Sequence, residues 1–186
     1  MPEVENAQNV IALLKSLRAV RQFRPDPVPQ EVVDAVLDVA RWSGSASNQQ
    51  SWEFVVIHNQ ETLRALAALE GFAAHLAGAA LGIVVVMAGD QGQVEQETFD
   101  EGRVSERMML AAAAYGVGSS IGWFKGRGRA AVKQMLGIPE NKLVRTEISF
   151  GYPDEEARRA HPKPAQARKP LSTLVYEERY GVRRQH

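Results

Sequence analysis

One run of the chain, Leu81 to Ala88, limits most sharply what this sequence can fold into. It carries no charge and contains the consecutive β-branched residues Ile83 to Val86. Branched side chains fit the pleated surface of a sheet and lose rotamer freedom in a helix. We therefore predict a strand over Leu81 to Ala88, and the fold must contain a sheet.

Three further segments have a strand pattern. Trp52 to His58 is rich in aromatic and β-branched residues and is bounded by polar turn formers. Ser119 to Phe124 is a short candidate, and Leu143 to Phe150 alternates in polarity before Gly151 to Pro153 end it. We expect a sheet of about four strands.

Helical spacing of apolar residues occupies the stretches between these strands. It predicts a helix around Val10 to Leu17 and another over Val32 to Ala40. Gln60 to Ala80 is rich in Ala and Leu with glycine breaks, which predicts two short helices covering one face of the sheet. A long helix is expected over Val94 to Tyr115, with Gly116 as its C-cap. Mixed strands and helices indicate an α+β or mixed α/β fold.

A short helix is predicted over Arg129 to Leu136. The chain after the last predicted strand is expected to be less regular. Asp154 to Lys169 is charged and contains prolines, which predicts an irregular surface tail that crosses to another element. At 186 residues with 45% hydrophobic and 24% charged composition, the chain suits a single globular domain over 1–186.

Composition excludes several classes of function. Lys plus Arg and Asp plus Glu both total 22, so the net charge is +0 and no long-range field attracts nucleic acid or anionic membrane. There is no cysteine, which excludes thiolate metal sites, iron–sulfur clusters and a cysteine nucleophile. The histidines have no ligand spacing, so no metal site is predicted and they are expected to be incidental or at the surface. These are His58, His75, His161 and His186.

The N-terminus and the apolar runs give an expectation about location. Met1 to Asn9 carries Glu3 and Glu5 where a secretory signal would be basic. The longest charge-free stretches, Leu76 to Ala88 and Met108 to Tyr115, fall short of the ~20 residues that span a bilayer. We therefore expect a soluble, cytoplasmic protein.

Two arginines follow the first predicted helix. Arg18 and Arg21 lie three residues apart, which would let two guanidinium groups converge on one dianionic group such as a phosphate. Two solvated surface arginines are the alternative. Spacing alone leaves both interpretations open.

A polar loop precedes the first predicted strand. Ser43 to Trp52 contains small residues, hydroxyls and amides, and amide side chains both donate and accept hydrogen bonds. Such a loop could bind the edge of a planar heteroaromatic ring, for example the pyrimidine ring of a flavin. An ordinary polar turn is the alternative.

Taken together, these segments resemble the nitroreductase family, whose members open with an Arg-Arg-Ser-Val-Arg-x-Phe type motif and a Pro-Val-Pro. An Ala-Pro-Ser-x-x-Asn-x-Gln-Pro-Trp-x-Phe segment follows in the family. The resemblance runs in one consistent order from about Leu17 to Gly181. The matching positions are Arg18, Val20, Arg21, Phe23, Pro27 to Pro29, Ser45, Asn48, Gln50, Trp52, Phe54, Gly116 to Ser119, Leu136 to Pro139, Gly151 to Pro153 and Arg168 to Leu171.

The resemblance implies a three-layer α+β fold, with a mixed, largely antiparallel sheet flanked by helices. It also implies FMN held at the interface of a homodimer, with electrons passing from NADH or NADPH to a small planar acceptor such as a nitroaromatic or quinone. The flavin then carries the chemistry, so no catalytic side chain is assigned.

The resemblance also assigns the cofactor contacts. Arg18 and Arg168 match positions that grip the FMN phosphate. Arg21 matches a cation near the pyrimidine side, where positive charge stabilises the reduced flavin. The other assigned positions border the isoalloxazine ring. These are Ser45, Ser47, Asn48 and Gln50 in the polar loop, and Ile121 and Gly122 as an approximate backbone contact.

The chain departs from the family pattern at Leu17 and Ala19, where many members have Arg and Ser, and at Gly44 and Ser51, where many have Pro. Ala19 stays a candidate contact, because a backbone amide can bind an anion. The departures motivate a second hypothesis, a flavin-binding protein or specialised flavin dehydrogenase without nitroreductase turnover. A third is a helical interaction protein without a cofactor.

Two glycine-containing motifs carry less weight. Gly116 to Gly122 superficially resembles a dinucleotide loop, but it follows a predicted helix instead of a strand. Lys125 to Arg129 could bind phosphate at the start of a helix, with a solvated basic loop as the alternative.

Overall fold

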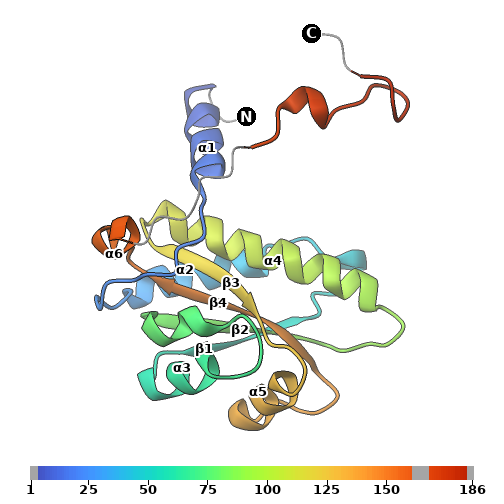
Figure 1. Ribbon diagram of the computed structural model, residues 1–186. Coiled ribbons are helices and arrows are strands. Elements are labelled where there is room, and N and C mark those ends of the chain that lie inside the picture. Colours follow the sequence, from blue (N-terminus) through green and yellow to red (C-terminus); the bar gives the residue numbers. More distant parts are fainter. Residues whose placement is uncertain (1–3, 161–167, 184–186) are drawn as a thin grey trace. The chain divides into compact units, whose positions relative to one another are not determined.

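A computed structural model describes residues 4–160 and 168–183 of the chain. Its contacts divide the chain into two units, residues 1–155 and residues 156–186, and each unit is described by itself. The first unit contains the sheet and the helices that cover it (Figure 1). The single domain over 1–186 stays a prediction.

A four-stranded antiparallel sheet lies at the centre of the first unit (Figure 1). Its strands are β1 (Trp52–Ile57), β2 (Leu81–Met87), β3 (Gly118–Trp123) and β4 (Leu143–Gly151). They lie in the order β1-β2-β4-β3, and each neighbouring pair is antiparallel. All four predicted strands are confirmed, with ends within one residue of the prediction.

The apolar run that predicted the first strand forms β2, between β1 and β4. Every residue of β2 is buried, because helices cover both faces of the sheet at this strand. The pairing of β2 with β4 shifts register between Val85 and Val86. Val85 pairs with Thr146 and Val86 with Val144, which leaves Arg145 outside the ladder, as in a β-bulge.

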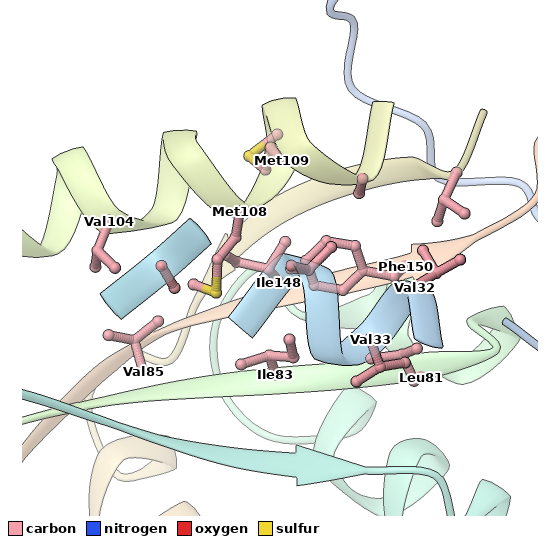
Figure 2. Close-up of a cluster of buried hydrophobic side chains, with 14 of the residues drawn as sticks. Val32, Val33, Leu81, Ile83, Val85, Val104, Met108, Met109, Ile148 and Phe150 are labelled. Atoms are coloured by element: carbon pink, nitrogen blue, oxygen red, sulfur yellow. The ribbon is translucent and has the colours of Figure 1, made fainter. Parts of the chain in front are cut away.

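Two helices cover one face of the sheet, α2 (Gln30–Arg41) and α4 (Val94–Ala114). Figure 2 shows their apolar side chains meeting those of the inner strands, for example Met108 of α4 close to Ile148 of β4. Buried apolar area is the main favourable term in folding, so this cluster anchors both helices to the sheet. The predicted second and long helices are confirmed.

Three shorter elements cover the opposite face: α3 (Gln60–Ala67), the 3-10 helix η2 (Ala74–Gly78) and α5 (Gly128–Leu136). They enclose a second apolar cluster that includes Leu63, Leu76 and Phe124. The prediction that Gln60 to Ala80 forms two short helical segments over one face is confirmed, the second as a 3-10 helix. Helices on both faces confirm the expected three-layer α+β fold with a largely antiparallel sheet (Figure 1).

The first helix, α1 (Val4–Ser16), is also confirmed, but its apolar residues are not buried. Val10 and Ile11 are each 49% exposed and Leu14 is 47% exposed. At the end of α4, Gly116 has the positive φ of +72° that favours glycine, which confirms it as the residue that ends this helix.

The expected irregular tail after Asp154 is wrong over its first residues, which form the helix α6 (Glu155–Ala160). Acidic residues at its start and Arg158 and Arg159 in its last turn favour a helix through the helix dipole. The rest of the expected tail, 161–167, lies outside the described residues. In the second unit, the structure also contains the 3-10 helix η3 (Leu171–Thr173). Among the described helices, none is long and apolar enough to cross a membrane.

Candidate functional site

The arginine segment after α1 runs beside β3. The backbone N–H of Val20 donates to the carbonyl of Ser119 at 2.8 Å, and Ala19 forms a parallel bridge with the same residue. Val20 is buried, whereas Ala19 and Arg21 are exposed. The buried valine and the backbone bridge therefore hold Arg21 at the surface next to β3.

Arg21 lines a pocket of about 540 Å³, here named the β3 pocket. Its lining consists of Arg21, Gly71, Phe72, Ala74, His75 and Ile121. Two predicted cofactor contacts, Arg21 and Ile121, are thus brought together although they are distant in the sequence. The volume lies in the range of ~300 to 1,000 Å³ that small-molecule sites have.

His75, which lines this pocket, has a buried side chain and lies beside a buried glutamate. The His75 side chain is 6% exposed and that of Glu147, on β4, is fully buried. His75 Nε2 lies 3.4 Å from Glu147 Oε1, and His75 Nδ1 lies 2.7 Å from the hydroxyl of Ser149. The expectation of an incidental or surface histidine is therefore wrong for His75, because η2 turns its ring towards β4.

Burial favours the neutral form of both groups. It raises the pKa of the Glu147 carboxyl from 4.5 to about 9. Burial and, secondly, the positive charge of Arg21 lower the pKa of His75 from 6.5 to about 4, although backbone groups of Phe72 and Ile121 act in the opposite direction. At neutral pH the pair is thus an uncharged carboxylic acid beside an uncharged imidazole.

Gly122 makes room for this pair. It lies directly opposite Glu147 in the β3–β4 ladder. A Cβ atom at this position would collide with Glu147 Oε1 and lie only 2.6 Å from the Phe72 carbonyl oxygen and 2.8 Å from His75 Nε2. Gly122, a predicted ring contact, is therefore buried between the β3 pocket residue Ile121 and the polar pair.

The polar loop predicted to border the flavin has a strained backbone. It contains the 3-10 helix η1 (Ala46–Asn48), and Ser47, Asn48 and Gln50 have positive φ values of 48°, 55° and 51°. Such values are uncommon outside glycine and cluster at functional sites. The Gln50 N–H donates to Ser45 Oγ at 2.9 Å. This bond helps to fix the loop.

The same loop is fastened to α4 and borders a second pocket. The Ala46 N–H donates to Asp100 Oδ2 at 3.0 Å, and Asp100 is ion-paired with Arg103 at 3.5 Å. The pocket, here named the α4 pocket, has a volume of about 360 Å³. It is lined by Ser45, Ala46, Glu95, Gln96, Phe99, Asp100 and Arg103.

The predicted contacts therefore separate into groups. Arg21 and Ile121 line the β3 pocket, with Gly122 behind it, whereas Ser45 lines the α4 pocket and the exposed Ser47, Asn48 and Gln50 follow in the same loop. The structure does not bring these two groups into one pocket of a single chain.

The two arginines expected at the phosphate are placed differently. Arg18 donates from Nη1 to the carbonyls of Lys15 at 2.8 Å and Leu17 at 2.7 Å, at the C-terminal end of α1. Arg168 is exposed and lies in the second unit, so its relation to the β3 pocket stays a prediction.

The basic loop before α5 is already occupied by an acidic side chain. The Arg127 N–H donates to Glu70 Oε2 at 3.0 Å, and the Lys125 N–H donates to the Glu70 carbonyl at 2.7 Å. The Lys125 ammonium lies 4.1 Å from the centre of the Phe72 ring, which makes it a neighbour of the β3 pocket.

The glycines at 116 and 118 follow helix α4 and lead into β3, which is not the strand-to-helix order of a dinucleotide loop.

The residues of the β3 pocket fit a flavin. The pocket combines the cation of Arg21 with apolar side chains, among them Phe72 and Ile121, and Gly122 follows Ile121 in β3. Buried polar atoms also lie behind it without hydrogen-bond partners, among them both carboxyl oxygens of Glu147 and the hydroxyl of Ser120.

His75 and Glu147 were not identified from the sequence. The available signal was a carboxylic acid in the middle of a predicted strand, Leu143 to Phe150.

Comparison with known proteins supports the same family. The nitroreductase family model matches residues 14–98. A nitroreductase of Mycolicibacterium smegmatis is 28% identical over an alignment that covers 84% of this chain and 88% of the relative.

Solved structures show the fold. An FMN-dependent nitroreductase from Clostridium difficile superposes with a TM-score of 0.77 at 24% identity, covering 91% of this chain and 99% of the other. The NADPH:FMN oxidoreductase of Vibrio harveyi, in complex with NAD⁺, gives 0.78 at 24% identity over 92% and 78% of the two chains. The predicted resemblance to the nitroreductase family is confirmed.

Proposed function

Because the chain resembles the nitroreductase family in sequence and in fold, we propose that it is an FMN-dependent oxidoreductase. It takes a hydride from NADH or NADPH and passes electrons to a small planar acceptor such as a nitroaromatic or a quinone. The observation that carries the proposal is the β3 pocket. Arg21 and Ile121 both line this pocket, and Gly122 is buried behind it.

In this proposal each group of residues has a part. Arg21 places positive charge beside the ring and stabilises its reduced, anionic form. The backbone at Ile121 and Gly122 contacts the ring, and Arg18, Ala19 and Arg168 bind the phosphate. When bound, the flavin supplies the hydride chemistry, while this chain supplies position, charge and exclusion of water.

The polar loop belongs to the proposed site through a second copy of the chain. Ser45 lines the α4 pocket, Ser47, Asn48 and Gln50 follow it in the same loop, and none of the four lines the β3 pocket of the same chain. We therefore propose a homodimer in which this loop from one protomer completes the flavin site of its partner. The half-exposed apolar residues of α1, Val10, Ile11 and Leu14, support an interface that covers them.

Flavin binding tests the proposal directly. The purified protein is incubated with FMN and freed of unbound flavin, and its visible spectrum is recorded. We expect bound flavin in the unaltered protein and at least tenfold weaker binding in Arg21→Ala, because a charge-assisted contact contributes ~1.5 to 3 kcal/mol. Arg64→Ala, an exposed arginine on α3, serves as the control and should bind normally. A protein that retains no flavin contradicts the proposal.

A second candidate is a flavin-binding protein without nitroreductase turnover. Leu17, at a position where many family members have arginine, packs against the apolar core cluster and cannot contact a phosphate as arginine does. Stopped-flow mixing separates the two candidates. Flavin that binds but is reduced by neither NADH nor NADPH would favour the second one, or another donor such as a reduced deazaflavin.

A further inference from the structure

We propose that His75 and Glu147 share one proton, and that this proton moves from Glu147 to His75 when negative charge develops in the β3 pocket. This inference rests on the proposed function, because the negative charge is that of the reduced flavin. It assigns to two side chains of this protein a part in stabilising the reduced state. Both residues lie outside the motifs that carry the family resemblance.

The hydrogen bonds around the pair determine where its protons are. The Ser149 hydroxyl donates to the carbonyl of Ser120 at 3.3 Å, so it must accept the bond from His75 Nδ1 at 2.7 Å. Nδ1 therefore carries the ring proton. His75 Nε2 is left with a free lone pair, 3.4 Å from Glu147 Oε1. The carboxylic acid proton of Glu147 can point to this nitrogen.

The surroundings of His75 also accommodate the charged ring. Its Nδ1–H already has an acceptor in Ser149, and an Nε2–H would have the Glu147 carboxylate before it. Backbone groups of Phe72 and Ile121 further favour the protonated ring. Transfer breaks the O–H bond of Glu147 and forms the N–H bond of His75. It needs no other reactant, and the net charge of the pair does not change.

The charge in the pocket decides between the two positions of the proton. Arg21 after α1, His75 in η2 and Glu147 in β4 are the charged or titratable groups at the pair. Lys125, whose ammonium lies over the Phe72 ring, adds a further positive charge near the pocket. With the pocket free of anions, the Arg21 cation disfavours a second positive charge on His75. An anion beside Arg21 offsets this repulsion. Because His75 lines the pocket and Glu147 lies behind it, transfer moves positive charge towards the anion.

Infrared spectroscopy follows the carboxyl proton directly. In the protein without flavin at pH 7, we expect the C=O stretching band of a buried protonated carboxyl, which Glu147→Gln removes and the exposed Glu61→Gln leaves in place. Photoreduction of bound FMN should then abolish or strongly weaken this band. In parallel, the Nε2 signal of His75 in nitrogen NMR should move to the position of a protonated nitrogen.

The reduction potential provides a second measurement. Glu147→Gln retains the shape of the neutral acid but has no transferable proton, so the reduced flavin loses stabilisation. We expect its affinity for reduced relative to oxidised FMN to fall about tenfold, which lowers the midpoint potential by about 30 mV for the two-electron couple. His75→Gln should have the same effect, whereas the exposed His58→Gln should have none.

The outcomes separate the two proposals. If no flavin binds, the proposed function fails and this inference fails with it. If flavin binds and is reduced while the carboxyl band persists, or if the unaltered protein shows no such band, the shared proton is contradicted and the proposed function stands. A structural role alone would change stability in Glu147→Gln without any band that responds to reduction.

Discussion

Gly122 leaves the space in which two buried polar side chains meet. A Cβ atom at this position would collide with Glu147 Oε1 and would lie only 2.8 Å from His75 Nε2. The family resemblance predicts that the backbone of this glycine contacts the cofactor ring. The structure adds a second reason for it, which is the fully buried acid on the neighbouring strand.

We expect Gly122→Ala to destabilise the protein by ~1 to 3 kcal/mol, as overpacking of a core does, and to displace the His75–Glu147 pair. Gly102→Ala is the matched control. Gly102 lies within α4 with nothing within 4 Å of the added Cβ, so this change should instead raise stability by up to ~1 kcal/mol. Chemical denaturation measures both. Equal effects of the two substitutions would contradict the collision at Gly122.

The buried pair makes stability depend on pH in a defined way. The pKa of Glu147 is raised to about 9 in the folded chain, and that of His75 is lowered to about 4. Between pH 4.5 and 6.5 the effects of the two groups on stability oppose each other. Compared with the unfolded chain, the folded chain keeps a proton on the Glu147 carboxyl but lacks one on the His75 imidazole. From pH 6.5 to about 9 only Glu147 contributes. The unfolding free energy should then fall with rising pH, by up to ~1.4 kcal/mol per pH unit.

Glu147→Gln tests this dependence, because an amide does not titrate. The difference in unfolding free energy between the two proteins is measured from pH 6 to pH 9, so that contributions from other groups cancel. The unfolding free energy of the unaltered protein, taken relative to that of Glu147→Gln, should fall steadily as the pH rises. A difference that is constant across this interval would show that Glu147 is ionised in the folded chain at neutral pH.

The loop before β1 shows the conflict between stability and function at the scale of an element. Ser47, Asn48 and Gln50 all have positive φ, and each non-glycine residue in that region costs roughly 1 kcal/mol. Local hydrogen bonds and the anchor at Asp100 hold the loop in this conformation. Residues kept in such a conformation agree with a binding role for the loop.

Gln50→Gly should raise stability by up to ~1 kcal/mol, because glycine adopts φ of 51° without strain. The same change should weaken FMN binding if the Gln50 amide contacts the ring. Gln49→Gly is the control, since Gln49 has an ordinary φ of −69° and should lose stability. Thermal unfolding measures the effect on stability, and FMN titration measures the effect on binding. If both variants gained stability, the gain in Gln50→Gly could not be attributed to relief of the positive φ at position 50.

For the whole molecule, the proposed homodimer shares each flavin site between two copies of the chain. This arrangement predicts complementation between defective chains. Arg21→Ala and Asn48→Ala should each bind FMN weakly alone. In co-expressed mixtures, half of the dimers contain one chain of each kind, and one of their two sites is intact.

About a quarter of the sites in such a mixture should therefore bind FMN normally. Titration of the mixture, compared with each variant alone, measures this fraction. Mixing Arg21→Ala with an Arg21→Ala chain that carries a different affinity tag is the control and should restore nothing. The absence of restored sites in dimers shown to contain both variants would place all contacts within one chain.

The sequence by itself determined most of the elements and the resemblance to a family. β-branched runs such as Ile83 to Val86 and helical spacing such as that of Val32 to Ala40 follow from local sterics and burial, which repeat at fixed intervals along the chain. Ordered motifs then indicated a nitroreductase-like fold, which the structure confirms. Glu155 to Ala160 was missed because its charges and nearby prolines suggested a loop, although their order favours a short helix.

Only the tertiary structure decided which distant residues meet. Neither Glu147 in a strand nor His75 in an alanine-rich segment shows by its spacing that η2 folds the histidine ring onto β4. Their contact depends on antiparallel pairing between β3 and β4 and on a glycine at 122. The separation of Arg21 from the Ser45 to Gln50 loop likewise arises from how the layers pack. Periodicity encodes which face of an element is buried, whereas the partner across that face is set by long-range packing.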